Sequence, residues 1–292
     1  MENIFGNLAR TFREGNILTK YIFINAGIFV VIRLATVFLI LFNIQSFSFL
    51  HYLQVSSSPM QLIYRPWTLI TYMFTQYDFL HILFNMLWLY WFGKLFLQFF
   101  NPRQFGGVYI LGGIAGAALF MAAYNVFPYF RAEALNSALI GASASVMAIV
   151  FAVSFYKQDY EISLLFIGRI KLIFLALGVV VLDFLAIAST NAGGHIAHLG
   201  GALFGIWFAL EMKTGKDRTA FVNRLIDRVV NMGKRKPKMR VSYKRAETDY
   251  DYHARKHEEN RALDAILDKL KQSGYASLSA EEKKQLFDAG KK

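Results

Sequence analysis

The sequence has no cysteine and very little charge between residues 21 and 210. The lack of cysteine excludes disulfide bridges, thiolate metal sites and a cysteine nucleophile. That stretch carries eight Lys/Arg and five Asp/Glu residues, whereas residues 213–292 carry 21 Lys/Arg and 12 Asp/Glu. A soluble core of such length needs charges spread along it, so the charge-poor block predicts a segment embedded in a lipid bilayer.

Long apolar runs fill this block. A membrane-spanning helix needs about 20 mostly apolar residues. The first run is too long for the apolar part of a cleaved signal peptide, so it predicts a retained span. The fourth run, residues 140–156, is short and rich in small residues, which favours a helix buried among other helices. The six candidate spans are 21–43, 79–100, 104–126, 140–156, 166–188 and 194–212.

The sequence therefore predicts an all-α membrane protein in three parts. These are a cytoplasmic N-terminal segment (1–20), a six-transmembrane-helix bundle (21–212) and a basic cytoplasmic tail (213–292). Lys and Arg concentrate on one side of the spans, so both termini are expected in the cytoplasm, with loops 44–78 and 127–139 outside. The expected location is the cell (inner) membrane, as a multi-pass protein.

The tail has its own pattern. Its basic run 234–240 favours attraction to anionic lipid over nucleic-acid binding. Residues 257–271 have apolar side chains at helical spacing, and a second short helix is expected from about Ser277 to Gly290. We expect a small helical module.

Polar side chains inside the predicted spans are costly in lipid, which makes them functional candidates. Taken singly, several have a structural explanation as hydrogen-bonding contacts or small packing residues. Their arrangement together is more specific. The residues are Arg33, His81, Asn85, Ser143, Ser145, Asp183, His195 and His198.

The second and fourth spans carry the first of these groups. His81 and Asn85 are four residues apart on the second span, so they share a face and can donate toward a common point. Ser143 lies near the N-terminus of the fourth span, where free N–H groups and the positive end of the helix dipole are found.

The sixth span offers a base beside a smooth helix face. His198, Gly201 and Gly205 lie on that face, and the Gly-x-x-x-Gly spacing permits close approach of another helix. The small-residue start of the fourth span, including Gly141, is the expected partner. Contact between the two spans would bring His198 against Ser143.

The other polar residues receive weaker interpretations. Ser145 points away from the face of Ser143. His195 lies off the glycine face and is expected at the membrane interface. Asp183 is open to two interpretations, as the third member of a triad or as a hydrated residue. Arg33 has no assigned role.

Three motifs occur in order on the second, fourth and sixth spans. They are His81-Ile82-Leu83-Phe84-Asn85, Gly141-Ala142-Ser143-Ala144 and Ala197-His198-Leu199-Gly200-Gly201. Together they resemble the motifs of the rhomboid intramembrane serine proteases, and the resemblance covers roughly residues 15–212. The tail stretch 266–287 looks like a C-terminal module of some bacterial rhomboids.

The resemblance implies a fold and a reaction. The fold is a six-helix bundle with a water-filled cavity open to the outside. The reaction is serine-type cleavage of transmembrane segments of other membrane proteins. Ser143 would be the nucleophile and His198 the base, while His81 and Asn85 would donate to the oxyanion. No essential acid, cofactor or metal is implied, and the sequence gives no signal for an oligomeric state.

Three positions depart from the family pattern. Ala144 replaces a glycine after the nucleophile, and we expect it to crowd the cavity slightly. Met147 stands where an aromatic ring often packs against the catalytic imidazole. Residues 65–68 read Arg-Pro-Trp-Thr where many members have Trp-Arg. None of these changes removes a catalytic group.

Other classes of membrane protein fit less well. A zinc protease of the membrane needs His-Glu-x-x-His, which is absent, and an aspartate pair is lacking because Asp183 is the only acid well inside a span. Two alternatives stay open. One is a non-proteolytic rhomboid-like protein that binds or hands on membrane clients. The other is a transporter or metal-handling protein that uses His81, His195, His198 and Asp183.

Overall fold

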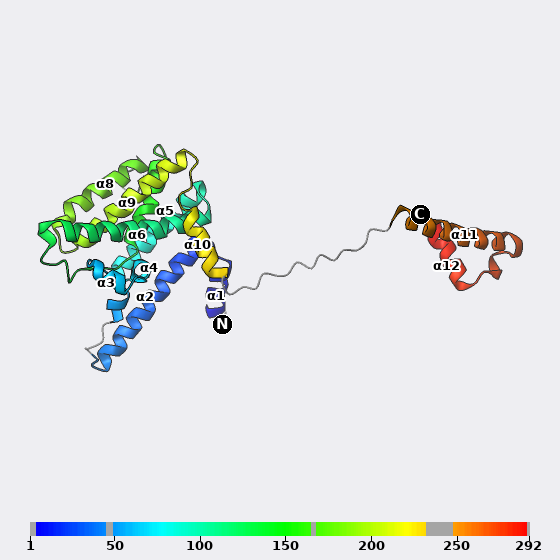
Figure 1. The fold of residues 1–292 in the computed structure, drawn as a ribbon, viewed down its shortest axis with the longest axis horizontal. Helices are drawn as coiled ribbons and strands as arrows, with labels where there is room; N and C mark the ends of the chain where they lie inside the picture. The colour runs from blue at the N-terminus through cyan, green and yellow to red at the C-terminus, as the bar shows by residue number, and fades with distance from the viewer. Residues whose placement is uncertain (1–3, 45–48, 165–167, 232–247, 291–292) are drawn as a thin grey trace. The chain divides into compact units, whose positions relative to one another are not determined.

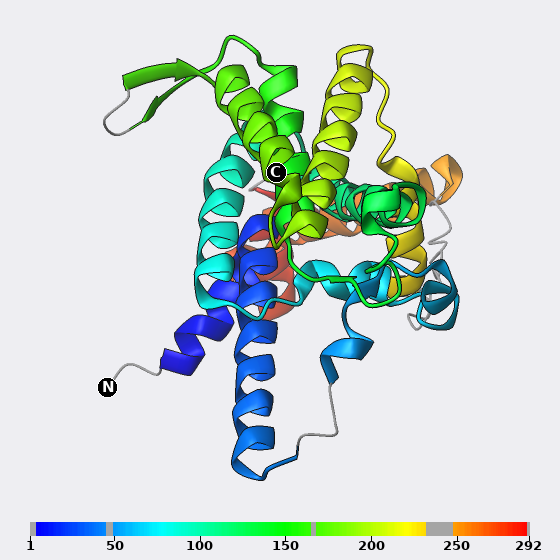
Figure 2. The same ribbon diagram turned by 90° about the vertical axis from the view of Figure 1, so that its left-hand side faces the viewer.

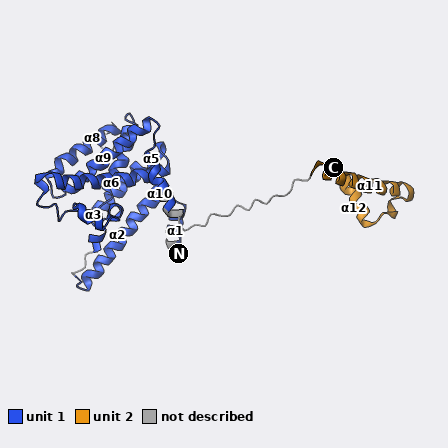
Figure 3. Ribbon diagram, in the orientation of Figure 1, with its two compact units in different colours: residues 1–234 blue, residues 235–292 orange. Residues whose placement is uncertain are grey.

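The computed structural model describes residues 4–44, 49–164, 168–231 and 248–290 (Figure 1). The chain forms two compact units, residues 1–234 and residues 235–292, which Figure 3 colours separately. The first unit is a helical bundle and the second a helical hairpin. The basic run 234–240 lies outside the described residues.

Apolar helices make up the first unit. Within the described ranges, four of them are long and apolar enough to cross a membrane: α2 (Ile17–Leu41), α5 (Phe79–Phe99), α6 (Pro102–Val126) and α9 (Ala192–Lys213). Two shorter apolar helices, α7 (Ser143–Tyr156) and α8 (Leu172–Leu185), occupy the other two predicted spans. The predicted all-α membrane bundle is confirmed, but six full-length spans are not.

The predicted fifth span, 166–188, is wrong at its start. Strands β3 (Glu161–Leu164) and β4 (Gly168–Lys171) form an antiparallel hairpin that projects from the bundle in Figure 2. Lys171 donates to Asp159 at 2.7 Å, an ion pair that belongs in water and not in hydrocarbon. The apolar helix therefore begins only at Leu172, and the one-turn helix η4 (Ala186–Ala188) extends it.

Helix α7 is the centre of the bundle. Every residue from Ala144 to Ser154 is buried, as its small-residue composition predicts. Its 14 residues make a helix about 21 Å long, whereas the hydrocarbon core is about 30 Å thick. One end of α7 must therefore lie below a membrane surface.

Glycines allow α6 and α9 to pack closely on α7. A β-carbon at Gly205 would meet Phe151 Cβ at 2.9 Å and Ala152 N at 3.0 Å, and one at Gly201 would collide with the carbonyl oxygen of Ala144. These distances are too short for any side chain, so the backbones of α7 and α9 touch directly. Helix α6 packs as closely on both neighbours. A β-carbon at Gly116 of α6 would meet the oxygen of Ala197 on α9 at 2.8 Å and the β-carbon of Ala144 on α7 at 2.6 Å.

The segments before α5 and before α7 are joined to each other near the start of α7. Loop 44–78 contains η1 (Phe49–Tyr52), α3 (Pro59–Tyr64), α4 (Thr68–Thr71), η2 (Tyr72–Phe74) and a short strand β1 (Val55–Ser56). Another one-turn helix, η3 (Pro128–Phe130), and strand β2 (Ala138–Leu139) lie between α6 and α7. Strands β1 and β2 pair antiparallel, with Val55 opposite Leu139. This pairing fixes the segment that leads into Ser143.

Two amphipathic helices were not predicted from the sequence. Helix α1 (Ile4–Glu14) precedes α2, and α10 (Ala220–Asn231) follows α9. Apolar side chains such as Phe12 and Phe221 are exposed on them, which suits a position among lipid headgroups. Gln104 of α6 donates to Asp217 at 3.1 Å, just before α10.

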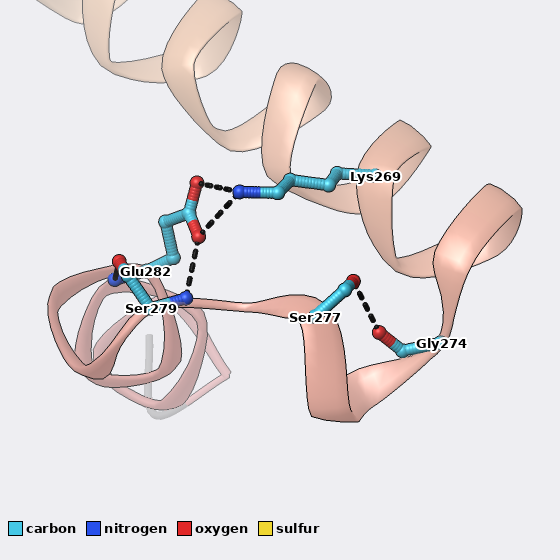
Figure 4. A network of polar contacts seen from close by, with 5 residues as sticks. All are labelled: Lys269, Gly274, Ser277, Ser279 and Glu282. Carbon is cyan, nitrogen blue, oxygen red and sulfur yellow. Dashed lines mark hydrogen bonds and ion pairs between the residues drawn. The ribbon is translucent and has the colours of Figure 1, made fainter.

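The second unit consists of α11 (Asp249–Ser273), a 3₁₀ turn η5 (Tyr275–Ser277) and α12 (Ala280–Ala289). A capping box starts α12, because the Ser279 hydroxyl accepts from Glu282 N and the Glu282 carboxylate accepts from Ser279 N. Lys269 of α11 also donates to that carboxylate at 2.9 Å (Figure 4). The helices are those the spacing predicts, although α11 starts earlier.

Replacing Gly205 with alanine should destabilise the bundle, because the new methyl group would enter the backbone of α7. Overpacking of this kind typically costs about 1–3 kcal/mol. We expect a lower melting temperature for Gly205→Ala in detergent, measured by thermal unfolding. The matched control is Gly178→Ala on α8, where a β-carbon meets no atom within 4 Å. Equal melting temperatures for both variants would contradict the proposed close contact.

Acid should loosen the start of α12. The N–H of Ser279 and the ammonium of Lys269 both stabilise the charged Glu282 carboxylate, so its pKa lies below the usual value. A depressed carboxyl pKa stabilises the fold above the unfolded pKa, and this stabilisation is lost as pH falls through the folded pKa. Backbone chemical shifts of residues 280–289 should move toward coil values below about pH 4.

The variant Glu282→Gln should lose this acid transition, because its amide oxygen can still accept from Ser279 N but does not titrate. Glu281→Gln, at the neighbouring exposed position, serves as its control and should keep the acid transition. A transition of equal size in Glu282→Gln would assign the pH effect to another group.

Candidate active site

The turn before α7 brings Ser143 and His81 together. Gly141 has φ +123°, a backbone conformation that side chains disfavour. A β-carbon there would meet His81 Nε2 at 3.1 Å and Ser143 Oγ at 3.8 Å. Gly141 was expected to serve helix packing, but it lies in this turn and not in a helix contact. Its missing side chain leaves room beside the serine.

Ser143 is the first residue of α7. The first N–H groups of a helix have no partner within the helix, and the helix dipole is positive at that end. A residue far away in the sequence also holds the turn, since the backbone N–H of Gly141 donates to the carbonyl oxygen of Tyr72 at 2.9 Å. The serine therefore lies where an oxyanion is stabilised.

A cavity of about 190 Å³ lies at this end of α7. Ser143, His198, Asn85 and Asp183 line it together, although they come from four different helices. Its apolar walls are formed by Phe84, Trp88, Val146, Met147 and Val179. The cavity thus gathers four of the eight polar residues singled out in the predicted spans.

His198 is held by a carboxylate. Its Nδ1 lies 2.9 Å from Asp183 Oδ1, while its Nε2 is buried and has no hydrogen-bond partner. His195 Nδ1 lies 2.8 Å from the same oxygen. His195 is half-buried. Asp183 is buried, so it is not an open, hydrated residue, which was one of its two interpretations. Two imidazoles of α9 contact its carboxylate.

Asn85 belongs to a buried polar chain. Its amide donates to Gln76 Oε1 at 2.8 Å, and Gln76 donates to Asn25 Oδ1 at 3.0 Å. Asn25 donates in turn to the hydroxyl of Tyr109 at 3.2 Å, which donates to Met73 O at 3.0 Å. This chain joins α2, α5 and α6, and it orients Asn85 while leaving one amide hydrogen for the cavity.

His81 is placed by the start of α5. Asp78 caps that helix and accepts from His81 N at 2.8 Å. The Nε2 atom of His81 is buried and unpartnered beside Gly141. His81 therefore has an unpartnered ring nitrogen beside Gly141, and Asn85 has one amide hydrogen to spare at the cavity.

The remaining candidates are placed as follows. Ser145 is buried, and its hydroxyl has no hydrogen-bond partner. Arg33 has a contact that the sequence did not suggest, with its guanidinium 4.7 Å from the ring centre of Tyr77. The methyl of Ala144 faces Gly116 of α6, so it does not crowd the cavity as expected. Met147 is buried and lines the cavity.

A metal ion is chemically compatible with one cluster. Among the described residues, Asp183, His195 and His198 have donor atoms within 4.8 Å of one another. The metal-handling alternative from the sequence named these three residues together with His81, which is not part of the cluster.

Known families match both units. The chain matches the family model described as Rhomboid domain over residues 64–213, just over half of its 292 residues. Residues 246–292 match DUF6576, a family of unknown function. The chain is also similar to presenilin-associated rhomboid-like protein A, mitochondrial, of Danio rerio, with 28% identity over 143 residues. That match covers 46% of this chain and 34% of the relative, so the chain spans about a third of the relative's length.

Gln76→Leu should destabilise the fold more than an exposed substitution does. It leaves Asn85 and Asn25 without their partner in a buried site, and each orphaned polar group costs about 1–3 kcal/mol. We expect a lower melting temperature in detergent. Gln98→Leu, at an exposed position of α5, is the control and should leave the melting temperature near wild type. An unchanged melting temperature in Gln76→Leu would mean that the amide chain adds nothing to stability.

Proposed function

Because the chain belongs to the rhomboid family, we propose that it is an intramembrane serine endopeptidase with Ser143 as nucleophile and His198 as general base. The observation that carries the proposal is one cavity lined by both residues, into which His198 presents an unpartnered nitrogen. Two helices that are far apart in sequence supply them. Their glycine-mediated contact gives the pair a rigid support.

The proposed reaction proceeds through an acyl-enzyme. His198 Nε2 takes the hydroxyl proton of Ser143 while the serine oxygen bonds to the carbonyl carbon of the scissile peptide. The protonated imidazole then gives its proton to the leaving amine as the C–N bond breaks. Water attacks the ester with His198 again as base, which releases the acid and restores the serine.

The tetrahedral oxyanion needs donors that are already in place. His81 Nε2, the free amide hydrogen of Asn85 and the Ser143 N–H are the proposed donors. Each such donor is worth about 3–4 kcal/mol in comparable enzymes. His81 would donate in the tautomer that carries its proton on Nε2.

Transmembrane segments of other membrane proteins are the proposed substrates. The lining of the cavity is largely apolar, and α7 is too short to reach both membrane surfaces, which supports placing the Ser143 end of α7 below the membrane surface. A helical substrate hides its carbonyl groups, so it must unwind before attack. We also propose that both termini face the cytoplasm of the cell (inner) membrane, from the bias of Lys and Arg.

The domain organisation follows from the same proposal. Residues 21–212 form the protease domain, and residues 213–292 form a tail that carries the helical hairpin. No cofactor or metal is assigned a role. The alternative function, binding or handing on of membrane clients without cleavage, would require neither a free serine nor a base.

A serine-directed fluorophosphonate should label the wild-type protein in detergent and fail to label Ser143→Ala. His198→Ala should cleave a transmembrane substrate at less than about 1% of the wild-type rate, because the general base contributes about 10²–10⁴-fold. Gel fluorescence and cleavage of a labelled transmembrane peptide measure the two effects.

Ser145→Ala is the matched control, since it removes a neighbouring hydroxyl on the same helix. It should keep both labelling and cleavage. Labelling that persists in Ser143→Ala would remove this serine as nucleophile. Wild-type protein that neither labels nor cleaves would favour the client-binding alternative, and activity lost to chelators would favour a metal site.

A further inference from the structure

Asp183 lies beside the catalytic pair without a role in the dyad that the family resemblance implies. Its Oδ1 atom is 2.9 Å from His198 Nδ1 and 2.8 Å from His195 Nδ1. The carboxylate comes from α8, whereas both imidazoles come from α9. We propose that Asp183 is a positioning residue that holds His198 in the tautomer required of a general base, with His195 as a second donor to the carboxylate. This inference rests on the proposed function.

The chemistry of the groups decides where the protons lie. An ionised carboxylate has no hydrogen to give, so each imidazole nitrogen facing it must carry one. His198 is therefore protonated on Nδ1, and its Nε2 has a free lone pair. This Nε2 atom is the one that is buried without a partner. The tautomer that the carboxylate selects is the one that can take a proton from Ser143.

The position of Asp183 is costly, which argues for a role. The residue is buried in an apolar helix, and its Oδ2 atom has no partner within the described structure. An acid at membrane depth is disfavoured by several kcal/mol, and one unsatisfied oxygen adds to this cost. A residue that served only packing would be replaced by leucine at no loss.

His195 gives the carboxylate a second contact on the same oxygen. A single hydrogen bond leaves a carboxylate free to rotate, whereas two donors from one helix face restrict its orientation. His195 and His198 are one turn apart on α9, so both reach Asp183 without distortion. The pair therefore keeps the charged oxygen directed at His198 Nδ1.

The same donor atoms could bind a metal ion in place of protons. Coordination needs the Nδ1 lone pairs of both imidazoles, so metal and Nδ1 protons exclude each other. A metal-bound cluster and a positioning carboxylate thus make opposite predictions about where the His198 proton lies. Nuclear magnetic resonance of histidine nitrogens distinguishes them directly.

The first measurement compares Asp183→Asn with wild type on a transmembrane peptide. Asparagine keeps the shape but loses the charge, so we expect kcat to fall by about 10²–10⁴-fold while KM stays within about threefold. Leu182→Ala, a lipid-facing change one position earlier, controls for general damage to α8 and should keep kcat. Thermal unfolding of both variants verifies that each is folded.

The second measurement needs no activity. Full-length protein labelled with ¹⁵N at its six histidines is studied in detergent, with His198→Gln to assign the signal. We expect the His198 proton on Nδ1 in wild type and on Nε2, or exchanging between both, in Asp183→Asn. This spectrum reports on positioning whether or not the protein proves to be a protease.

The outcomes separate the two proposals. An Asp183→Asn variant with wild-type kcat would overturn the positioning role and leave a Ser143–His198 dyad. A wild-type His198 protonated on Nε2 would overturn it as well, and so would nitrogen shifts that respond to added Zn²⁺ chelator. Wild-type protein without any activity would count against the proposed function alone, because the tautomer spectrum would still decide the place of Asp183.

Discussion

The direct contact between the backbones of α7 and α9 is the constraint on which the rest of the structure depends. Gly201 and Gly205 leave no room for a β-carbon against α7, so the two helices approach more closely than side chains allow. Lipid gives no hydrophobic driving force for helix association, so close packing must hold such helices together. The same contact brings a serine at one helix end to an imidazole on the other, so fold and site share one interaction.

Several buried polar groups of the bundle have a hydrogen-bond partner or line the cavity, whereas the hydroxyl of Ser145 does neither. The amide chain from Asn85 to Tyr109 crosses three helices, and the Asp183 cluster joins α8 to α9. The Nε2 atoms of His81 and His198 are buried without a partner. That of His81 lies beside Gly141 near Ser143, and His198 lines one cavity with Ser143. Unsatisfied nitrogen atoms are costly in a low-dielectric interior, so their concentration beside one serine favours chemistry over packing.

The two units of the chain are stabilised by different physics. The first depends on close packing of apolar helices with few charges. The hairpin of α11 and α12 buries little, and it uses a capping box and the Lys269–Glu282 ion pair, both of which are exposed to water. Surface pairs of this kind contribute little each and respond to pH and salt. The stability of the hairpin is thus expected to depend on pH and salt through this pair.

The sequence alone determined the class of protein and most of its helices, and it singled out Ser143, His198, His81 and Asn85 as candidate site residues. These follow from local properties, because apolar runs, charge bias and motif spacing act within one segment. It did not determine the hairpin at 161–171, the fit of Ala144 against Gly116, or the sharing of Asp183 by two histidines. Those features depend on how each helix is rotated and how deep it lies against its neighbours. Only the packed structure decides this, because residues far apart in sequence must fill the same space.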